Sequence, residues 1–333
     1  MSIHLGFPIW VLVHGQWGWF SAIFSPTSGL ARSSLARNAG FSVTLAMGTQ
    51  FSPHTIAPHM ASDSIGTMIL DATCHISYSS NSPIPAVMML RPRSGYAQWI
   101  TREEYAFEPH APVVEYTDKF GNLCQRVLIP KGTFEVQCSC RAHTADTVDV
   151  DLDAPFVPVH NLPESALEFL LPSRYCQSDL LNDLAASIAG QQPPGYRQVG
   201  AIEQWLRDQM QYVHGVSNAS TSALDTAQSR TGVCRDYAHL GIALTRSLNI
   251  PARMVVGYLY GLEPMDLHAW FEAFVGGRWF TFDGVQKEAR GNRILIGYGR
   301  DAADVALTSN YGALQLTSMK VTVEKAVLET KSI

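Results

Sequence analysis

The sequence predicts an α+β protein in which an antiparallel β-rich region precedes a mixed region of helices and strands. Residues 67–159 consist of short runs that alternate apolar and polar residues between Pro, Gly and Asn, a pattern typical of β-strands. From residue 178 onwards, three stretches carry apolar residues at helical spacing, and alternating runs follow them. The 333-residue chain is 46% apolar and 16% charged, so it has the composition of a globular protein of about two domains.

The first fifth of the chain differs in charge from the rest. Residues 1–62 contain no Asp or Glu, and Arg32 and Arg37 are their only formal charges. Residues 5–24 are nearly uncharged, but a proline and three glycines interrupt them, and no basic cluster precedes them as in a secretory signal. We therefore expect no stable membrane insertion and a cytoplasmic protein. We interpret residues 1–62 as a targeting leader, a disordered extension or sequence upstream of the working protein.

The remaining chain divides into two predicted domains. Residues 63–160 predict an antiparallel sandwich or small barrel, with a hairpin turn at Asp118–Asn122 in which Gly121 supplies a positive φ. A proline-containing connector at 154–165 marks the boundary to the second domain, 161–333. There we expect helices over 178–189, 196–212 and 233–248, with a Ser/Thr/Asn-rich loop at 217–233. The alternating run 314–324 predicts one more strand on the sheet of this second domain.

The net charge and the cysteines exclude several classes of function. The chain carries −5 at neutral pH, which argues against a nucleic-acid partner bound by a basic surface. Cys138, Cys140 and His143 lie close together, but alternation puts both thiols on one strand face and no second ligand pair follows, so we expect no metal site. No nucleotide or other cofactor is expected. Most cysteines lie in apolar runs and are expected to be small buried hydrophobic residues.

Cys234 stands in a different setting. It follows Thr231-Gly232-Val233 at the first turn of a predicted helix, where free backbone N–H groups and the helix dipole favour a thiolate. Asp236 near the same helix end is expected to stabilise the helix dipole or to act as a cap rather than to take part in catalysis. His239 lies about 140° round the helix from the thiol and is expected to be structural.

A predicted hairpin downstream brings a histidine and an aspartate together. Residues 267–275 and 278–283 alternate strictly on either side of Gly276-Gly277, a favoured two-residue turn. Pairing Val275 with Arg278 puts Trp270 opposite Asp283 and His268 opposite Val285, so His268 and Asp283 become diagonal neighbours on one face. The other face is small and aromatic and is expected against the core; it consists of Ala269, Phe271, Ala273, Phe280 and Phe282.

These three side chains are what nucleophilic acyl transfer requires. We predict that Cys234 attacks the substrate, that His268 stabilises the thiolate and protonates the leaving amine, and that Asp283 orients the imidazole. The backbone N–H of Cys234 is a natural oxyanion donor. Candidates for a second oxyanion or substrate contact are Gln228, Tyr212 and Trp270.

Two stretches resemble the core of the bacterial transglutaminase-like superfamily: TGVCRDYAHLGIALTRSLNIPARMVVGYLYG at 231–261 and LHAWFEAFVGGRWFTFDG at 267–284. The resemblance spans about residues 178–285 and implies a papain-like fold with a Cys234–His268–Asp283 triad. The β-rich segment is similar to the N-terminal domain of the bacterial subfamily. Gly284-Val285 departs from the Pro-containing turn of many members, which leaves inferences about the substrate loop open.

The predicted function is a thiol-dependent enzyme that cleaves or transamidates a peptide, isopeptide or glutamine amide in a peptide or protein substrate. One alternative is a non-catalytic peptide-binding or assembly module that retains the fold. Another is a triad acyltransferase or amidase for a different substrate class. No calcium loop of the D-x-[DN]-x-[DN]-G type is present in the sequence. Whether the acyl acceptor is water or an amine, and the oligomeric state, remain open at this point.

Overall fold

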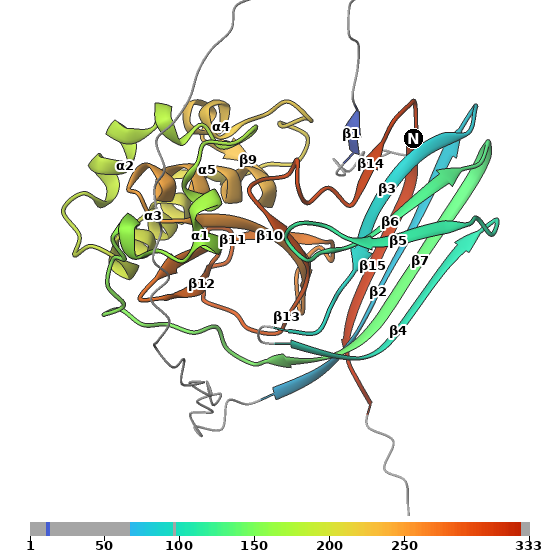
Figure 1. The fold of residues 1–333 in the computed structure, drawn as a ribbon, viewed down its shortest axis with the longest axis horizontal. Coiled ribbons are helices and arrows are strands. Elements are labelled where there is room, and N and C mark those ends of the chain that lie inside the picture. The colour runs from blue at the N-terminus through green and yellow to red at the C-terminus, as the bar shows by residue number, and fades with distance from the viewer. Residues whose placement is uncertain (1–10, 14–66, 96–97, 328–333) are drawn as a thin grey trace, which may run out of the picture. The chain divides into compact units, whose positions relative to one another are not determined.

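The computed structural model describes residues 11–13, 67–95 and 98–327 (Figure 1). Our interpretation of residues 1–62 therefore lies outside the described residues, apart from β1 (Val11–Val13). This short strand pairs in parallel with β14 (Thr308–Asn310). None of the helices in these ranges is long and apolar enough to cross a membrane.

Two sheets form the β-rich region, in the orders β15-β2-β7-β4 and β1-β14-β3-β6-β5. Apart from the β1–β14 pair, their strands are antiparallel as the sequence predicts. Alternate residues of β2 and β7 are buried, because strand side chains point to opposite faces in turn. The strands span β2 (Thr67–Ser80), β3 (Ile84–Arg91), β4 (Gln98–Glu108), β5 (Val113–Thr117), β6 (Leu123–Ile129) and β7 (Gly132–Ala145).

The turn predicted at Asp118–Asn122 joins β5 to β6. Gly121 has φ +85°, and its N–H donates to the carbonyl of Asp118 over 3.0 Å. The Asp118 carboxylate accepts the backbone N–H groups of Phe120 (2.9 Å) and Asn122 (2.8 Å), as an Asx turn requires. The hairpin prediction is confirmed.

The C-terminal strand lies in a different sheet from the one expected. β15 (Gln315–Lys325) pairs antiparallel with β2 along almost its whole length, so it does not extend the sheet of the second domain. Alternation predicts a strand but not its partner. The long edge of β2 offers a ladder to β15, and Val321 and Val323 are buried there. The division into 63–160 and 161–333 stays a prediction, since residues near the end of the chain complete the first region.

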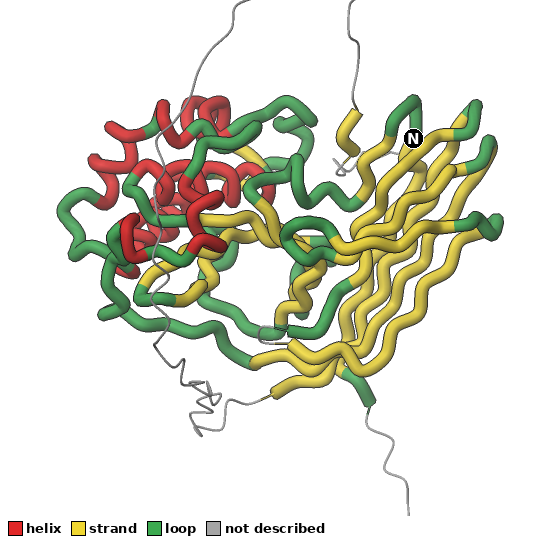
Figure 2. Tube along the Cα trace, in the orientation of Figure 1, coloured by secondary structure: helices red, strands yellow, loops and turns green. Residues whose placement is uncertain are grey.

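The second region places helices against the sheet β12-β11-β10-β13 (Figure 2). The helix α5 (Cys234–Ser247) packs on β11 (His268–Val275), and its Gly241 faces Phe271 so closely that an added Cβ would lie 2.6 Å from the ring. The small and aromatic face predicted for the hairpin is buried in this core. The remaining strands are β10 (Ala252–Leu259), β12 (Arg278–Phe282) and β13 (Arg293–Gly299).

The helices differ from the predicted ranges at their ends. A 3-10 turn at Ser178–Leu180 precedes α2 (Asn182–Ala189), α3 (Tyr196–Gln209) stops short of Tyr212, and α1 (Glu164–Leu167) is one short turn. The loop predicted at 217–233 contains α4 (Ala223–Ser229). Its N-cap Ser222 and Asp225 form a capping box, in which the Asp225 carboxylate accepts the Ser222 N–H over 2.9 Å. The Ser-x-x-Asp pattern is a signal that could have located this helix.

Candidate active site

Cys234 is held at the start of α5 by a local capping arrangement. The carboxylate of Asp236 turns back to accept the Val233 N–H over 2.9 Å, and Arg235 pairs with the same carboxylate over 3.1 Å. Gly232 is required here because a Cβ would lie 2.6 Å from the Cβ of Asp236. Asp236 therefore caps the helix, as expected, and leaves the thiol at the end where backbone N–H groups are free.

The hairpin of β11 and β12 brings His268 to Asp283. Gly276 and Gly277 have φ +58° and +85°, and Val275 pairs with Arg278 as predicted. The imidazole Nε2 lies 2.7 Å from Asp283 Oδ2, and the Cys234 side chain lies near enough to the same histidine to raise its pKa. The structure thus brings together the three residues that we predicted as a triad.

One detail of the predicted register is wrong. The ladder ends at Phe271 and Phe282, so His268 has no strand partner at Val285. Asp283 instead accepts the Val285 N–H with its Oδ1 over 3.1 Å, which turns the chain away from the sheet. The other carboxylate oxygen remains directed at the imidazole.

The electrostatics of this group favour a protonated His268. Burial alone lowers the pKa of the imidazole, but the Asp283 carboxylate and the Cys234 side chain more than offset it and raise the pKa to about 9. Burial raises the pKa of Asp283, whereas His268 and Arg293 lower it, and the net result lies well below the usual carboxyl range. Asp283 is therefore an anion beside an imidazolium near neutral pH.

The sequence does not indicate that Arg293 belongs to this site. It begins β13, and its guanidinium donates to Asp283 Oδ2 over 2.8 Å while lying 4.8 Å from the centre of the Trp270 ring. The guanidinium is nearly buried. Nothing in the run 293–299 distinguishes this arginine, because its partner is ten residues earlier, just beyond the end of β12.

Trp270 packs against His268 and is not among the described residues that line the cleft reported below. Its ring stacks on His268 with centroids 6.1 Å apart, and it clusters with Val255, Leu295 and Tyr298. Such an apolar neighbour shields the His268–Asp283 hydrogen bond from water. Its indole Nε1 is buried without a hydrogen-bond partner in the part of the chain that the structure describes, and Trp270 as an oxyanion donor stays a prediction.

Two amide side chains of the β-rich region hold β13 by its backbone. Gln98 accepts the Leu295 N–H over 2.6 Å and donates to the Leu295 carbonyl over 2.9 Å. Asn122 does the same for Tyr298, over 3.0 and 2.8 Å. Each amide thus imitates a neighbouring strand along the free side of β13. Because Arg293 belongs to β13, these contacts fix the strand that supports Asp283.

Tyr212 lies beside the thiol because of a short parallel pair. After α3 ends, β8 (Gln211–Tyr212) pairs with β9 (Thr231–Gly232), which leads directly into Cys234. The Tyr212 hydroxyl lies beside the backbone and the side chain of Cys234, and burial is the main cause that raises its pKa. Gln228 is exposed on α4 and is not among the described residues that line the cleft. Of the three candidates, Tyr212 is the one positioned beside Cys234.

His239 is buried away from this group, as expected. Its Nε2 accepts the Ala302 N–H over 3.1 Å, and its ring stacks on Tyr175 with centroids 5.0 Å apart. Burial lowers its pKa to about 3, so the imidazole is neutral. These contacts are those of a structural histidine.

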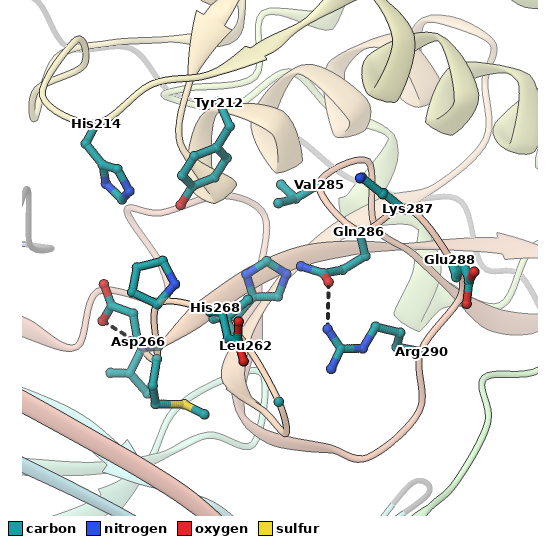
Figure 3. Close-up of a pocket in the computed structure, with 15 residues that line it drawn as sticks. Tyr212, His214, Leu262, Asp266, His268, Val285, Gln286, Lys287, Glu288 and Arg290 are labelled. Atoms are coloured by element: carbon teal, nitrogen blue, oxygen red, sulfur yellow. Dashed lines mark hydrogen bonds between the residues drawn. The ribbon is translucent and has the colours of Figure 1, made fainter.

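A cleft of about 690 Å³ opens beside His268 (Figure 3). Tyr212 and His214 lie along one side, and the loop after β12, from Val285 to Arg290, lies along the other. The lining residues are Tyr212, His214, Gly261, Leu262, Glu263, Pro264, Met265, Asp266, Leu267, His268, Val285, Gln286, Lys287, Glu288 and Arg290. A cleft of this volume can hold several residues of a peptide.

Comparison with known proteins assigns the family. The sequence model of the Transglutaminase-like superfamily matches residues 182–284, which include Cys234, His268 and Asp283. The crystal structure of a candidate cysteine protease from Cytophaga hutchinsonii is 34% identical with a TM-score of 0.73, and the match covers 80% of this chain and 93% of that chain. The chain belongs to the transglutaminase-like superfamily.

Two mycobacterial relatives match over shorter stretches. The uncharacterized protein ML0607 of Mycobacterium leprae is 35% identical over 136 residues, which are 38% of this chain and 48% of that protein. The uncharacterized protein Rv2569c of Mycobacterium tuberculosis is 33% identical over 109 residues, 28% of this chain and 35% of the relative. The matched stretches thus span half or less of these relatives.

The other cysteines of this transglutaminase-like chain have buried, protonated thiols. Burial raises the pKa of Cys74 and Cys140 to about 12 and that of Cys124 to about 11. Burial also raises the pKa of Cys138 and Cys176. Across residues 67–95 and 98–327, no three His, Cys, Asp or Glu side chains gather as metal ligands would. Cys234 is distinguished from the other thiols by its contact with an imidazolium.

Proposed function

We propose that this transglutaminase-like protein is a thiol-dependent acyl-transfer enzyme that acts on the amide carbonyl of a peptide, an isopeptide or a glutamine side chain. The observation that supports this most strongly is the chain of contacts from Cys234 to His268 and from His268 Nε2 to Asp283 Oδ2, 2.7 Å away. A protonated imidazole beside a thiol favours the thiolate, which is the nucleophilic form. A buried carboxylate behind the imidazole fixes its orientation.

The chemistry follows from these positions. The Cys234 sulfur forms a bond to the carbonyl carbon, and the oxygen takes the negative charge. His268 then gives its proton to the nitrogen, the carbon–nitrogen bond breaks, and an amine or ammonia leaves a thioester on Cys234. Water or a primary amine attacks the thioester, His268 takes the proton of the attacking group, and the sulfur leaves as the thiolate.

The oxyanion of both tetrahedral intermediates requires hydrogen-bond donors beside the sulfur. The backbone N–H of Cys234 lies at the start of α5, where N–H groups have no partner within the helix, and it faces the Tyr212 hydroxyl. The Tyr212 hydroxyl adjoins the same backbone group and supplies a second donor. Two donors aimed at a developing charge stabilise the transition state more than the ground state.

The test is mass spectrometry of glutamine-containing peptides incubated with the purified protein, with and without a primary amine. Loss of ammonia, incorporation of the amine and backbone cleavage give different product masses. We expect Cys234→Ala to abolish every product while it keeps the circular dichroism spectrum of the wild type. An active Cys234→Ala protein would refute the proposal, and a wild-type protein that forms none of the three products would also refute it.

We also propose that the enzyme works in the cytoplasm. Its six cysteines are free thiols, including Cys74 and Cys138, which face each other across β2 and β7. Free thiols at such positions are typical of reducing compartments. Immunoblotting of fractionated cells checks this, and enrichment outside the cytoplasmic fraction would overturn it.

A further inference from the structure

The cleft beside the triad contains a carboxylate that the proposed chemistry does not use. Asp266 lies two residues before His268 in the chain and lines the same cleft (Figure 3). Its Oδ1 accepts the N–H of the adjacent Leu267 over 2.7 Å. This local bond fixes the carboxyl group at the edge of the cleft, before the chain enters β11.

The charges around Asp266 are distributed unevenly. In Figure 3, His214 lies on the same side of the cleft as Asp266, while Lys287 and Arg290 lie on the other side, beyond His268. Arg290 is already engaged, since it donates to Gln286 Oε1 (2.9 Å) and to the Tyr260 carbonyl (2.6 Å).

Partial burial destabilises the charged form of Asp266 more than its own contacts stabilise it. Burial raises its pKa, while its bond to the Leu267 N–H and the fields of His214 and His268 lower it by less. Throughout residues 67–95 and 98–327, no lysine or arginine forms an ion pair with this carboxylate. A partly dehydrated carboxylate is stabilised strongly by a hydrogen-bonded cation, because water screens the pair less than it would on the surface.

We propose that Asp266 binds a protonated primary amine of the substrate and so selects substrates that carry a positive charge beside the scissile amide. This inference rests on the proposed function and adds a substrate class to it. The position fits because the carboxylate lines the cleft next to the triad, and Tyr212 and His214 add aromatic surface with ring centroids 5.2 Å apart. The amine belongs either to the acyl donor, as an amino terminus or lysine side chain, or to a diamine acceptor.

The test compares Asp266→Asn with Glu263→Gln. Glu263 is an exposed acid of the same loop and lines the same cleft. Its variant therefore also removes one negative charge from the cleft, but from an exposed position instead of a partly buried one. Glutamine peptides with a free and with an acetylated amino terminus probe the donor. Cadaverine and its amino alcohol analogue probe the acceptor.

We expect Asp266→Asn to raise KM about 10- to 100-fold for the ammonium-bearing member of one pair, as the loss of a charged hydrogen bond implies. The neutral member should keep its KM and kcat. If Asp266→Asn changes KM equally for both members of each pair, the inference is overturned. It is also overturned if Glu263→Gln raises the KM of the ammonium-bearing substrate as much as Asp266→Asn does. Turnover of the neutral substrates shows that the triad works in either case, which separates this inference from the proposed function.

A second measurement does not depend on turnover. Cadaverine in the cleft should slow the alkylation of Cys234 by iodoacetamide in the wild type and in Glu263→Gln, and should not slow it in Asp266→Asn. The uncharged diol of the same length is the control and should protect none of them. Equal protection of Asp266→Asn and the wild type by cadaverine would contradict the assignment of Asp266.

Discussion

The ion pair between His268 and Asp283 gives the most demanding prediction. The pKa of His268 is about 9 against an ordinary 6.5, which corresponds to about 300-fold in proton affinity, or about 3 kcal/mol. Asp283 is the largest contributor that raises it, whereas burial lowers it. Asp283→Asn should therefore lower the pKa of His268 well below 9, because burial is then opposed by the Cys234 side chain alone.

The same shift predicts how stability depends on pH. Because the folded-state pKa of His268 is raised, its contribution is fully present below pH 6.5 and is lost as the pH rises through about 9. Urea unfolding should show that the free energy of unfolding falls between pH 6 and pH 10 in the wild type. This fall should be up to about 3 kcal/mol larger in the wild type than in Asp283→Asn. The pKa itself can be followed by NMR of the imidazole ring carbons in histidine-labelled protein.

Asp283→Asn also leaves Arg293 buried beside a neutral amide, which can destabilise the fold. The double variant Asp283→Asn with Arg293→Gln removes both charges and serves as the matched control. We expect the pKa of His268 to fall in both variants. A pKa that stays near 9 in the folded double variant would refute the role of Asp283, and a wild-type value of 6.5 or lower would refute the ion pair itself.

Three other substitutions test separate parts of the structure. Gln98→Leu leaves the backbone groups of Leu295 without partners and should cost about 2 kcal/mol of unfolding free energy in urea; an unchanged midpoint would contradict the role of this contact. Tyr212→Phe should lower kcat about 100- to 1000-fold with little change in KM; an unchanged kcat would exclude the hydroxyl as an oxyanion donor. Gly241→Val forces a side chain against Phe271, 2.6 Å from the position of Cβ, and should lower stability by about 1–3 kcal/mol in the same urea assay, so a variant as stable as the wild type would contradict the close packing of α5.

Local rules made the hairpin and the start of α5 predictable. Gly276-Gly277 supplies the two positive φ angles that a tight turn needs, and this turn fixes the pairing of Val275 with Arg278 and hence the face that carries His268. Similarly, Gly232 and Asp236 within five residues of each other define the helix end at Cys234. These contacts lie within a few residues along the chain, so the residues alone determine them.

Contacts between distant segments could not be predicted in this way. Gln98 and Leu295 are 197 residues apart, and no property of a single glutamine indicates that it will bind the backbone of a strand. The partner of β15 was misassigned for the same reason, because alternation specifies a strand and leaves its neighbour open. Arg293 belongs to this group, since its role arises only when β13 lies beside Asp283.

Alkylation of the native protein with iodoacetamide at pH 6, followed by peptide mapping, tests the central claim most directly. All six cysteines are buried, but five of them have raised pKa values and should not react, whereas Cys234 lies beside the His268 imidazolium. We predict one modified residue, Cys234, in the wild type, and no modification in a folded His268→Gln variant. An unmodified Cys234 in the wild type, or equal modification in both proteins, would contradict the thiolate–imidazolium pair on which the proposed function depends.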